Sequence, residues 1–242
     1  MTHVNNVQAF EKLLGICTGL GGSYNPGKQN LRIENVSNLL ILARGTLLQV
    51  SIAKSNHEQA QNDREIAFTE MRALISRIMA ELRSSGALPQ TVADATLMVR
   101  RIRGFVKAEK PAATMAPEAT GGSSEAGGRK RNSADFGNSA AYFEKLLQTL
   151  GNESMYHPMH PALQMDTLQA KLIQLRNANA AVVAAYVRWS NARRERTNVL
   201  YLGSNSLHNT AMAMKQQVQA SFGFSNEATA LVRKIRFTKL IK

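Results

Sequence analysis

Apolar residues recur at every third or fourth position through most of the chain. The first half contains three such stripes: Val36, Leu40, Ala43, Leu47 and Val50; Phe68, Met71, Ile75, Ile78 and Leu82; Val92, Ala95, Val99, Ile102 and Val106. The second half contains three more: Leu168, Leu172, Leu175, Val182 and Trp189; Leu207, Ala211, Met214 and Val218; Ala228, Val232 and Ile235. Each stripe covers one face of a helix, and no long segment shows the alternation that a strand requires. The pattern predicts an all-α fold.

Each half is expected to contain about four helices. We predict a short first helix, a loop with glycine and proline, two long helices and a shorter last helix. The last helix is expected to begin near Pro89 in the first half and near Ser225 in the second. Short connections make such helices antiparallel neighbours, so each half predicts a small bundle. The polar residues and the glycine of Leu202–Ser206 predict a break in the third helix of the second half.

The two halves share three short matches in the same order. Phe10–Leu14 recurs as Phe143–Leu147, Tyr24–Pro26 as Tyr156–Pro158, and Val99–Arg103 as Val232–Arg236. The offset is 133 residues in the first and third matches and 132 in the second. These matches predict a tandem duplication, with helical bundles at residues 1–108 and 139–242. The intervening residues 109–138 are rich in Gly, Ser, Pro and Ala and predict a flexible linker.

Composition indicates a globular protein of the cytoplasm. Hydrophobic residues make up 44% of the 242 residues, which is typical of folded domains. The single cysteine, Cys17, excludes an internal disulfide and has no counterpart in the second half, so we expect a packed thiol. The first residues lack the features of a signal peptide. The sequence contains no run of 18 apolar residues, so no membrane span is expected.

The net charge of +13 is typical of proteins that attract polyanions. Both halves are basic: residues 1–107 hold 13 basic and 8 acidic side chains, and residues 140–242 hold 13 and 5. The candidate binding residues are Arg100, Arg101, Arg103, Arg233, Lys234, Arg236, Lys239 and Lys242. They alternate with apolar residues, so the cations are expected to face outward and contact phosphate groups without base specificity. Alternatively, these cations only interact favourably with the dipole at the C-terminal ends of the helices. The net charge would then only confer solubility.

Two motifs suggest cofactor or metal chemistry, and neither is complete. Gly22–Lys28 resembles the first seven positions of a phosphate-binding loop, but Gln29 replaces the hydroxyl residue and no strand is predicted before it. We expect a tight loop instead, packed by Tyr24 and, in the second half, by Tyr156. His157 and His160 are three residues apart without an evident third ligand. No cofactor and no metal are therefore expected.

Catalysis is not predicted, because the 17 acidic residues are scattered and no nucleophile or metalloprotease pattern is present. The expected function is that of a non-enzymatic structural protein. Its helical bundles would associate with further copies into an oligomer, filament or lattice. The alternative is a basic protein that coats or bridges DNA or RNA through the Arg-rich last helix of each half.

Overall fold

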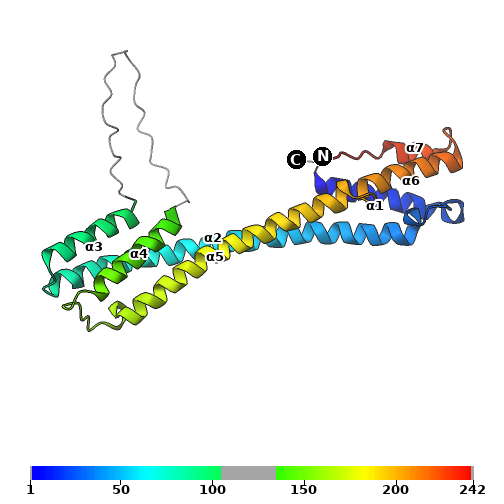
Figure 1. The fold of residues 1–242 in the computed structure, drawn as a ribbon. Coiled ribbons are helices and arrows are strands. Elements are labelled where there is room, and N and C mark those ends of the chain that lie inside the picture. Colours follow the sequence, from blue (N-terminus) through cyan, green and yellow to red (C-terminus); the bar gives the residue numbers. More distant parts are fainter. Residues whose placement is uncertain (1, 105–134, 241–242) are drawn as a thin grey trace, which may run out of the picture. The chain divides into compact units, whose positions relative to one another are not determined.

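The computed structural model describes residues 2–104 and 135–240, and all their regular elements are helical, without a strand (Figure 1). This confirms the predicted all-α class. The helices are α1 (His3–Gly19), α2 (Ile33–Ser84), α3 (Pro89–Ile102), α4 (Asp135–Gly151), α5 (Met165–Thr197), α6 (Leu207–Phe222) and α7 (Glu227–Lys234). Most of the predicted linker lies outside the described residues, but its last four residues, 135–138, begin α4.

The first half contains three α-helices among its described residues, whereas about four were expected. The two long helices predicted there are one continuous helix, α2, of 52 residues. Residues 51–67, which would have joined the two, contain neither glycine nor proline. Nothing in this stretch interrupts the backbone hydrogen bonds, so the helix continues through it.

The second half does contain the predicted break. Helix α5 passes into a π-helical segment, Asn198–Leu202, and α6 begins after a turn at Gly203, with the Ser206 side chain accepting a hydrogen bond from the Asn209 backbone N–H. In α2, the successive core residues Phe68 and Met71 are three residues apart. In the second half, the successive core residues Tyr201 and Leu207 are six residues apart. The π segment and the turn accommodate these three additional residues between core positions.

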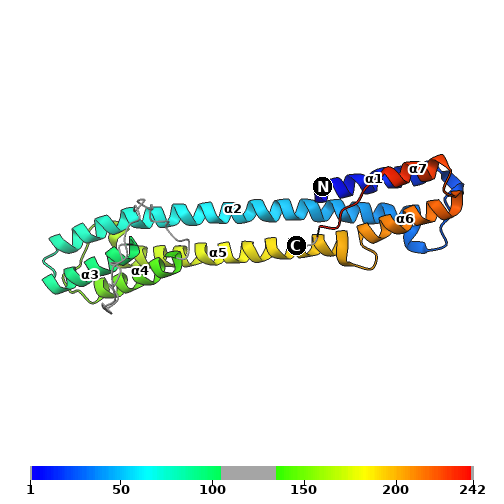
Figure 2. The ribbon, with the colours of Figure 1, turned by 90° about the horizontal axis from the view of Figure 1, so that it is seen from above.

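The chain forms two compact units. The terminal unit consists of Met1–Gln59 and Ala184–Lys242, and the central unit consists of Ala60–Val183. In the terminal unit, α1, α6 and α7 pack with the beginning of α2 (Figures 1 and 2). Its core includes Val7, Phe10, Leu13, Cys17, Val36, Ala43, Leu200, Tyr201, Leu207, Met214, Val218 and Val232.

The central unit contains α3, α4, the end of α2 and the beginning of α5. Its core includes Phe68, Met71, Ile75, Ile78, Leu82, Val99, Ile102, Phe143, Leu146, Leu150, Leu168 and Leu175. These units divide the chain differently from the expected domains at 1–108 and 139–242. Each unit combines the first helix of one half with the last helix of the other, because α2 and α5 each place one end in each core.

The loop after the first helix has the same geometry in both halves. The hydroxyl of Tyr24 donates to the carbonyl of Leu31, and that of Tyr156 to the carbonyl of Leu163, each at 3.1 Å. Both rings are buried, which confirms the prediction that these tyrosines pack their loops. Burial, with a further effect of the Glu81 charge, raises the pKa of Tyr156 to about 12.

Candidate functional site

The predicted cations at the end of α3 lie on the surface of the central unit. Arg100, Arg101 and Arg103 are exposed, and their apolar neighbours are buried. Two of them have aromatic or polar partners. Arg101 donates to the Tyr142 hydroxyl at 3.0 Å and lies 5.3 Å from its ring centre, and Arg103 donates to the Ser76 hydroxyl at 2.9 Å. These contacts orient the guanidinium groups without neutralising them.

The cations near the C-terminus were expected on one helix, but the structure divides them between a helix and the segment after it. Helix α7 ends at Lys234, and Arg236 and Lys239 lie in the extended segment that follows it. This segment obtains its hydrogen bonds from other side chains: Lys215 donates to the Ile235 carbonyl at 2.7 Å. The backbone therefore has partners without continuing the helix.

The predicted polyanion-binding residues form two separate groups. Arg100, Arg101 and Arg103 belong to the central unit, while Arg233, Lys234, Arg236 and Lys239 belong to the terminal unit. Lys242 lies outside the described residues. Among residues 2–104 and 135–240, none of these seven described cations takes part in a salt bridge. Their charges remain available to a ligand.

The two incomplete motifs have structural roles. The loop that resembles a phosphate-binding loop follows a helix, α1, and the ring of Tyr24 within it is buried. His160 accepts a hydrogen bond from the backbone N–H of Ala162 at 3.1 Å and so caps a short 3₁₀ helix. In the described part of the chain, no three potential metal ligands lie together.

Burial governs the chemistry of the single cysteine. Cys17 is fully buried in the terminal unit. Burial raises the pKa of its thiol to about 11, although a contact with Tyr24 acts in the opposite direction. The thiol is therefore protonated at neutral pH, and this agrees with the packed role expected for it.

A buried polar cluster in the terminal unit was not predicted from the sequence. Asn6 donates to the Thr238 carbonyl at 2.7 Å and to the Tyr201 hydroxyl at 3.0 Å, and it accepts from the Thr238 N–H at 3.1 Å. His3 shares a 2.8 Å hydrogen bond with the same tyrosine. The cluster thus fixes the C-terminal segment to α1. No local sequence pattern predicts this cluster, because its members are up to 232 residues apart.

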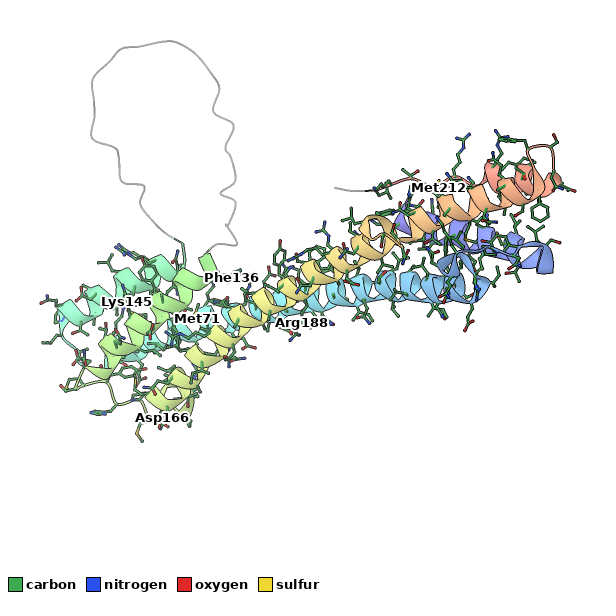
Figure 3. The ribbon with its side chains drawn as sticks, turned by 45° about the vertical axis from the view of Figure 1, so that its right-hand side comes forward. Met71, Phe136, Lys145, Asp166, Arg188 and Met212 are labelled. Atoms are coloured by element: carbon green, nitrogen blue, oxygen red, sulfur yellow. The ribbon has the colours of Figure 1, made fainter. Side chains whose placement is uncertain are left out.

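The corresponding place in the central unit is apolar. The residue 133 positions after His3 is Phe136, and the residue 133 positions before Tyr201 is Phe68. These two rings contact each other at 4.8 Å, and the Arg64 guanidinium lies 4.2 Å from the centre of the Phe136 ring. Figure 3 labels Phe136 on α4. The two units therefore use the same pair of positions, one with polar and one with apolar side chains.

The terminal unit also carries an aromatic surface with arginines, which we call the Tyr186 surface (His57, Tyr186, Trp189, Arg193 and Arg194). The His57 ring stacks on Trp189 at 5.6 Å and lies 5.7 Å from Tyr186. Arg193 lies 5.4 Å from the Trp189 ring centre. The sequence pattern marked Trp189 as a core position, but the structure leaves it only partly buried.

A second unpredicted surface is the outer stripe of α2 (Ile41, Gly45, Leu48 and Ile52). Its three large side chains are 67%, 60% and 44% exposed, respectively. They recur at intervals of seven and four residues, with Gly45 between the first two, and so lie along one face. Val36, Ala43 and Thr46 are buried on the opposite side. This part of α2 is therefore apolar on two opposite faces. Within the described residues, the face with Val36 and Ala43 is covered by the terminal core, and the outer stripe is exposed.

By length and composition alone, α2 would also suffice to cross a membrane. Only 22% of its most apolar 18-residue window is buried. A soluble core helix and a signal sequence can pass the same test, so this property describes the exposed apolar surface and does not assign a span.

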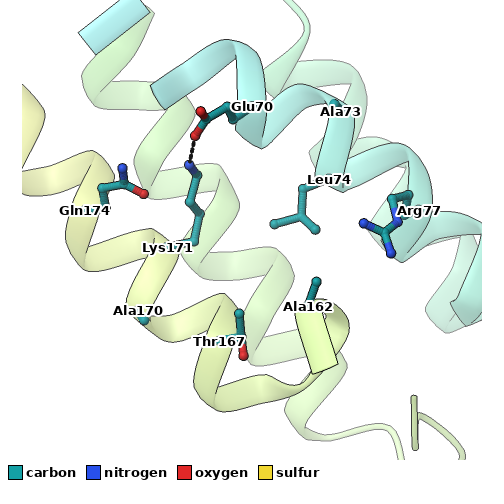
Figure 4. Close-up of a pocket in the computed structure, with 9 residues that line it drawn as sticks. All are labelled: Glu70, Ala73, Leu74, Arg77, Ala162, Thr167, Ala170, Lys171 and Gln174. Atoms are coloured by element: carbon teal, nitrogen blue, oxygen red, sulfur yellow. Dashed lines mark hydrogen bonds and ion pairs between the residues drawn. The ribbon is translucent and has the colours of Figure 1, made fainter. Parts of the chain in front are cut away.

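A shallow groove of about 520 Å³ lies on the central unit between α2 and α5 (Figure 4). Small side chains, among them Ala73 and Ala170, line it, together with Leu74. Lys171 donates to Glu70 at 2.6 Å across its rim, so these two charges neutralise each other. Arg77, Thr167 and Gln174 also line the groove.

No protein-family model, no curated protein and no solved structure matches this chain. The fold and its surfaces define the class: an all-helical protein with two compact units, an exposed apolar helix face and several exposed basic groups.

Proposed function

We propose that the protein is a non-enzymatic structural subunit that associates with further copies of itself through the outer stripe of α2. The observation that carries this proposal is the exposure of Ile41, Leu48 and Ile52 on the face opposite the core. A helix that is apolar on all sides is normally covered on all sides, because exposed aliphatic area is unfavourable in water.

The spacing of the stripe favours another helix as the occupant. Intervals of four, three and four residues from Ile41 to Ile52 are those of a helix-to-helix seam. Gly45 carries no side chain, and apart from the backbone of its own helix and its chain neighbours no atom lies within 4 Å of the Cβ position that another residue would have there. Two α2 helices can therefore approach closely at this point. A two-fold axis near Gly45 would bring the same stripe of each copy together.

Charge around the stripe favours a second copy over a lipid surface. Arg44 is the one charged residue between Val36 and Ala53, and it forms a 2.6 Å salt bridge with Glu11. The stripe is therefore close to neutral, so two copies can meet there although the whole chain is basic. A helix that binds anionic lipid carries cations beside its apolar face. A membrane-spanning α2 would also have to withdraw Val36 from the terminal core.

The proposal includes an origin by tandem duplication. The identical Tyr24 and Tyr156 hydrogen bonds support it, and so does the reciprocal pairing of His3 with Tyr201 and of Phe136 with Phe68. A duplicated chain presents similar surfaces twice, which suits assembly into larger structures. A polyanion-binding role is the second candidate, because the described cations of α3 and α7 are exposed and outside salt bridges.

Replacement of Leu48 by Glu tests the proposed contact. We expect the wild-type protein to form dimers or larger species whose mass, measured by light scattering after gel filtration, rises with concentration and resists 1 M salt. Leu48→Glu should weaken association about tenfold or more, since a buried leucine contributes ~1.5–3 kcal/mol and 1.4 kcal/mol corresponds to tenfold. Leu97→Glu on α3 is the matched control, because Leu97 is also exposed but lies in the central unit.

Three results would contradict the proposal. The first is a monomer at every concentration and salt level. The second is flotation of a monomeric wild-type protein with anionic vesicles that Leu48→Glu abolishes, because the stripe would then face lipid. Equal association of Leu48→Glu and wild type would show that any oligomer uses another surface.

A further inference from the structure

Tyr186 presents an exposed aromatic ring in a fixed setting. Its side chain is 54% exposed, although its ring contacts His57 at 5.7 Å and meets Trp189 edge to face at 6.3 Å. The supporting rings restrict its rotation. An exposed ring that is held by two others loses little entropy when a flat ligand stacks on it.

Unneutralised arginines lie beside this ring. Arg193 is seven residues after Tyr186, which places it on the same face of α5, two turns and about 10 Å further along. Arg194 is exposed next to it. Neither forms a salt bridge within the described residues. Residues 189–197 hold three arginines and a single acid, Glu195, so the surface beside the ring is positive.

We propose that the Tyr186 surface binds single-stranded nucleic acid, with a base stacked on Tyr186 and phosphates contacted by Arg193 and Arg194. Every unpaired base offers a flat face of the size of this ring, and the phosphates follow at a spacing that the two arginines can reach. In a duplex the base faces are covered, so double-stranded DNA lacks the stacking contact. A second copy of this basic chain would meet repulsion at this place.

The Tyr186 surface is separate from the other exposed surfaces of the protein. It uses neither the outer stripe of α2 nor the cations at the ends of α3 and α7. Self-association through Leu48 and nucleic-acid binding at Tyr186 can therefore hold or fail independently.

The fluorescence of Trp189 provides a direct test, because it is the only tryptophan in the chain. The full-length protein, purified free of nucleic acid, is titrated with a 20-nucleotide oligo-dT and with a duplex of equal length at low salt. Binding of oligo-dT should quench the tryptophan emission. The duplex and heparin, which carry charge without unpaired bases, should quench it far less at equal charge concentration.

Variants separate stacking from charge. Tyr186→Ala should weaken oligo-dT binding roughly 5- to 150-fold, the range for loss of one stacked base, and Tyr186→Phe should retain wild-type affinity. Changing both Arg193 and Arg194 to Ala should reduce the slope of log affinity against log salt by roughly 1.4, since each phosphate contact to a single strand contributes about 0.7. Arg188→Ala is the control, because Arg188 is two residues after Tyr186 and so lies about 200° around the helix from it. Figure 3 labels Arg188 on α5.

The proposal is overturned by an absence of oligo-dT binding at low salt, or by Tyr186→Ala binding as tightly as wild type. It is also overturned if heparin quenches as strongly as oligo-dT, since that shows charge without stacking. If removal of Arg233, Lys234 and Arg236 abolishes binding while the Tyr186 variants retain it, the end of α7 is the site instead. Trp189 quenching that follows protein concentration alone would assign the surface to a protein contact.

Discussion

At the scale of single residues, the clearest difference between the two units is the choice of polar or apolar side chains at matching positions. His3, Asn6 and Tyr201 form a hydrogen-bonded cluster in the terminal unit, whereas Phe136 and Phe68 form a dry contact in the central unit. The polar version ties the C-terminal segment to α1, which an apolar pair cannot do. It also makes the terminal unit sensitive to pH, because burial lowers the pKa of the His3 imidazole below its ordinary value.

We predict that the stability of the terminal unit falls below about pH 6.5. Burial, and then the nearby Arg196 charge, lower the pKa of His3 below its ordinary value of 6.5. The unfolded chain therefore binds a proton more readily than the folded chain. The contribution of His3 is fully present above pH 6.5 and is lost as the pH falls through the lower folded pKa.

Urea unfolding followed by circular dichroism between pH 8 and pH 5 measures this effect. The unfolding midpoint of the wild type should fall over this range by more than that of His3→Gln, which cannot titrate. At pH 8 both proteins have a neutral side chain at this position, so that comparison controls for lost packing. An identical decrease in both proteins would show that other groups cause the pH dependence.

At the scale of elements, α2 combines two surfaces that are usually found on different helices. One face supplies Val36 and Ala43 to the terminal core, and the other exposes the outer stripe. Gly45 lies in that stripe, inside a regular helix, where glycine is less favourable than alanine by about 0.5–1 kcal/mol. Close approach of another helix at this position would explain why a side chain is missing there.

Gly45→Ala is expected to separate these two effects. The free energy of unfolding should rise by ~0.5–1 kcal/mol, because the added methyl group has open space and alanine favours the helix. Self-association should weaken at the same time, because the methyl group holds the two helices apart. Chemical unfolding and light scattering measure the two quantities.

Gly15→Ala in α1 is the matched control, since Gly15 is also helical and exposed with open space around it. It should stabilise the fold without changing association. If Gly45→Ala leaves association unchanged, the helices do not meet closely at Gly45.

At the scale of the whole molecule, each compact unit needs residues from both halves of the chain. Val36 of the first half and Leu200 of the second lie in one core, and Phe68 and Phe143 lie in the other. In this arrangement an isolated half lacks the partners of its apolar faces, and the exposed apolar area would make it unstable or prone to aggregate.

We therefore predict that residues 1–108 and 139–242, expressed as separate fragments, fold only together. Each fragment alone should show low helicity by circular dichroism or should aggregate. When co-expressed, they should purify as a 1:1 complex with the helicity of the intact protein. Independent, monomeric folding of either fragment would contradict the division of the chain into these two units.

The sequence was sufficient where structure depends on neighbouring residues. The stripe from Phe68 to Leu82 is buried as predicted, the Tyr24 and Tyr156 loops pack as expected, and the second half breaks after Leu202. Periodicity, turn residues and loop tyrosines act over a few residues, so they can be recognised in the chain itself. The outward orientation of Arg100 and Arg233 followed from the same rule.

Tertiary structure decided which faces meet. The two halves carry similar stripes, so the sequence offered each stripe two similar partners, one within its own half and one in the other. The continuity of α2 through residues 51–67 places its second part in the central core. That choice also creates the contacts of His3 with Tyr201 and of His57 with Trp189, which join residues 198 and 132 positions apart, respectively. Local patterns contain no information about such pairs, because they depend on the competition between alternative packings of the whole chain.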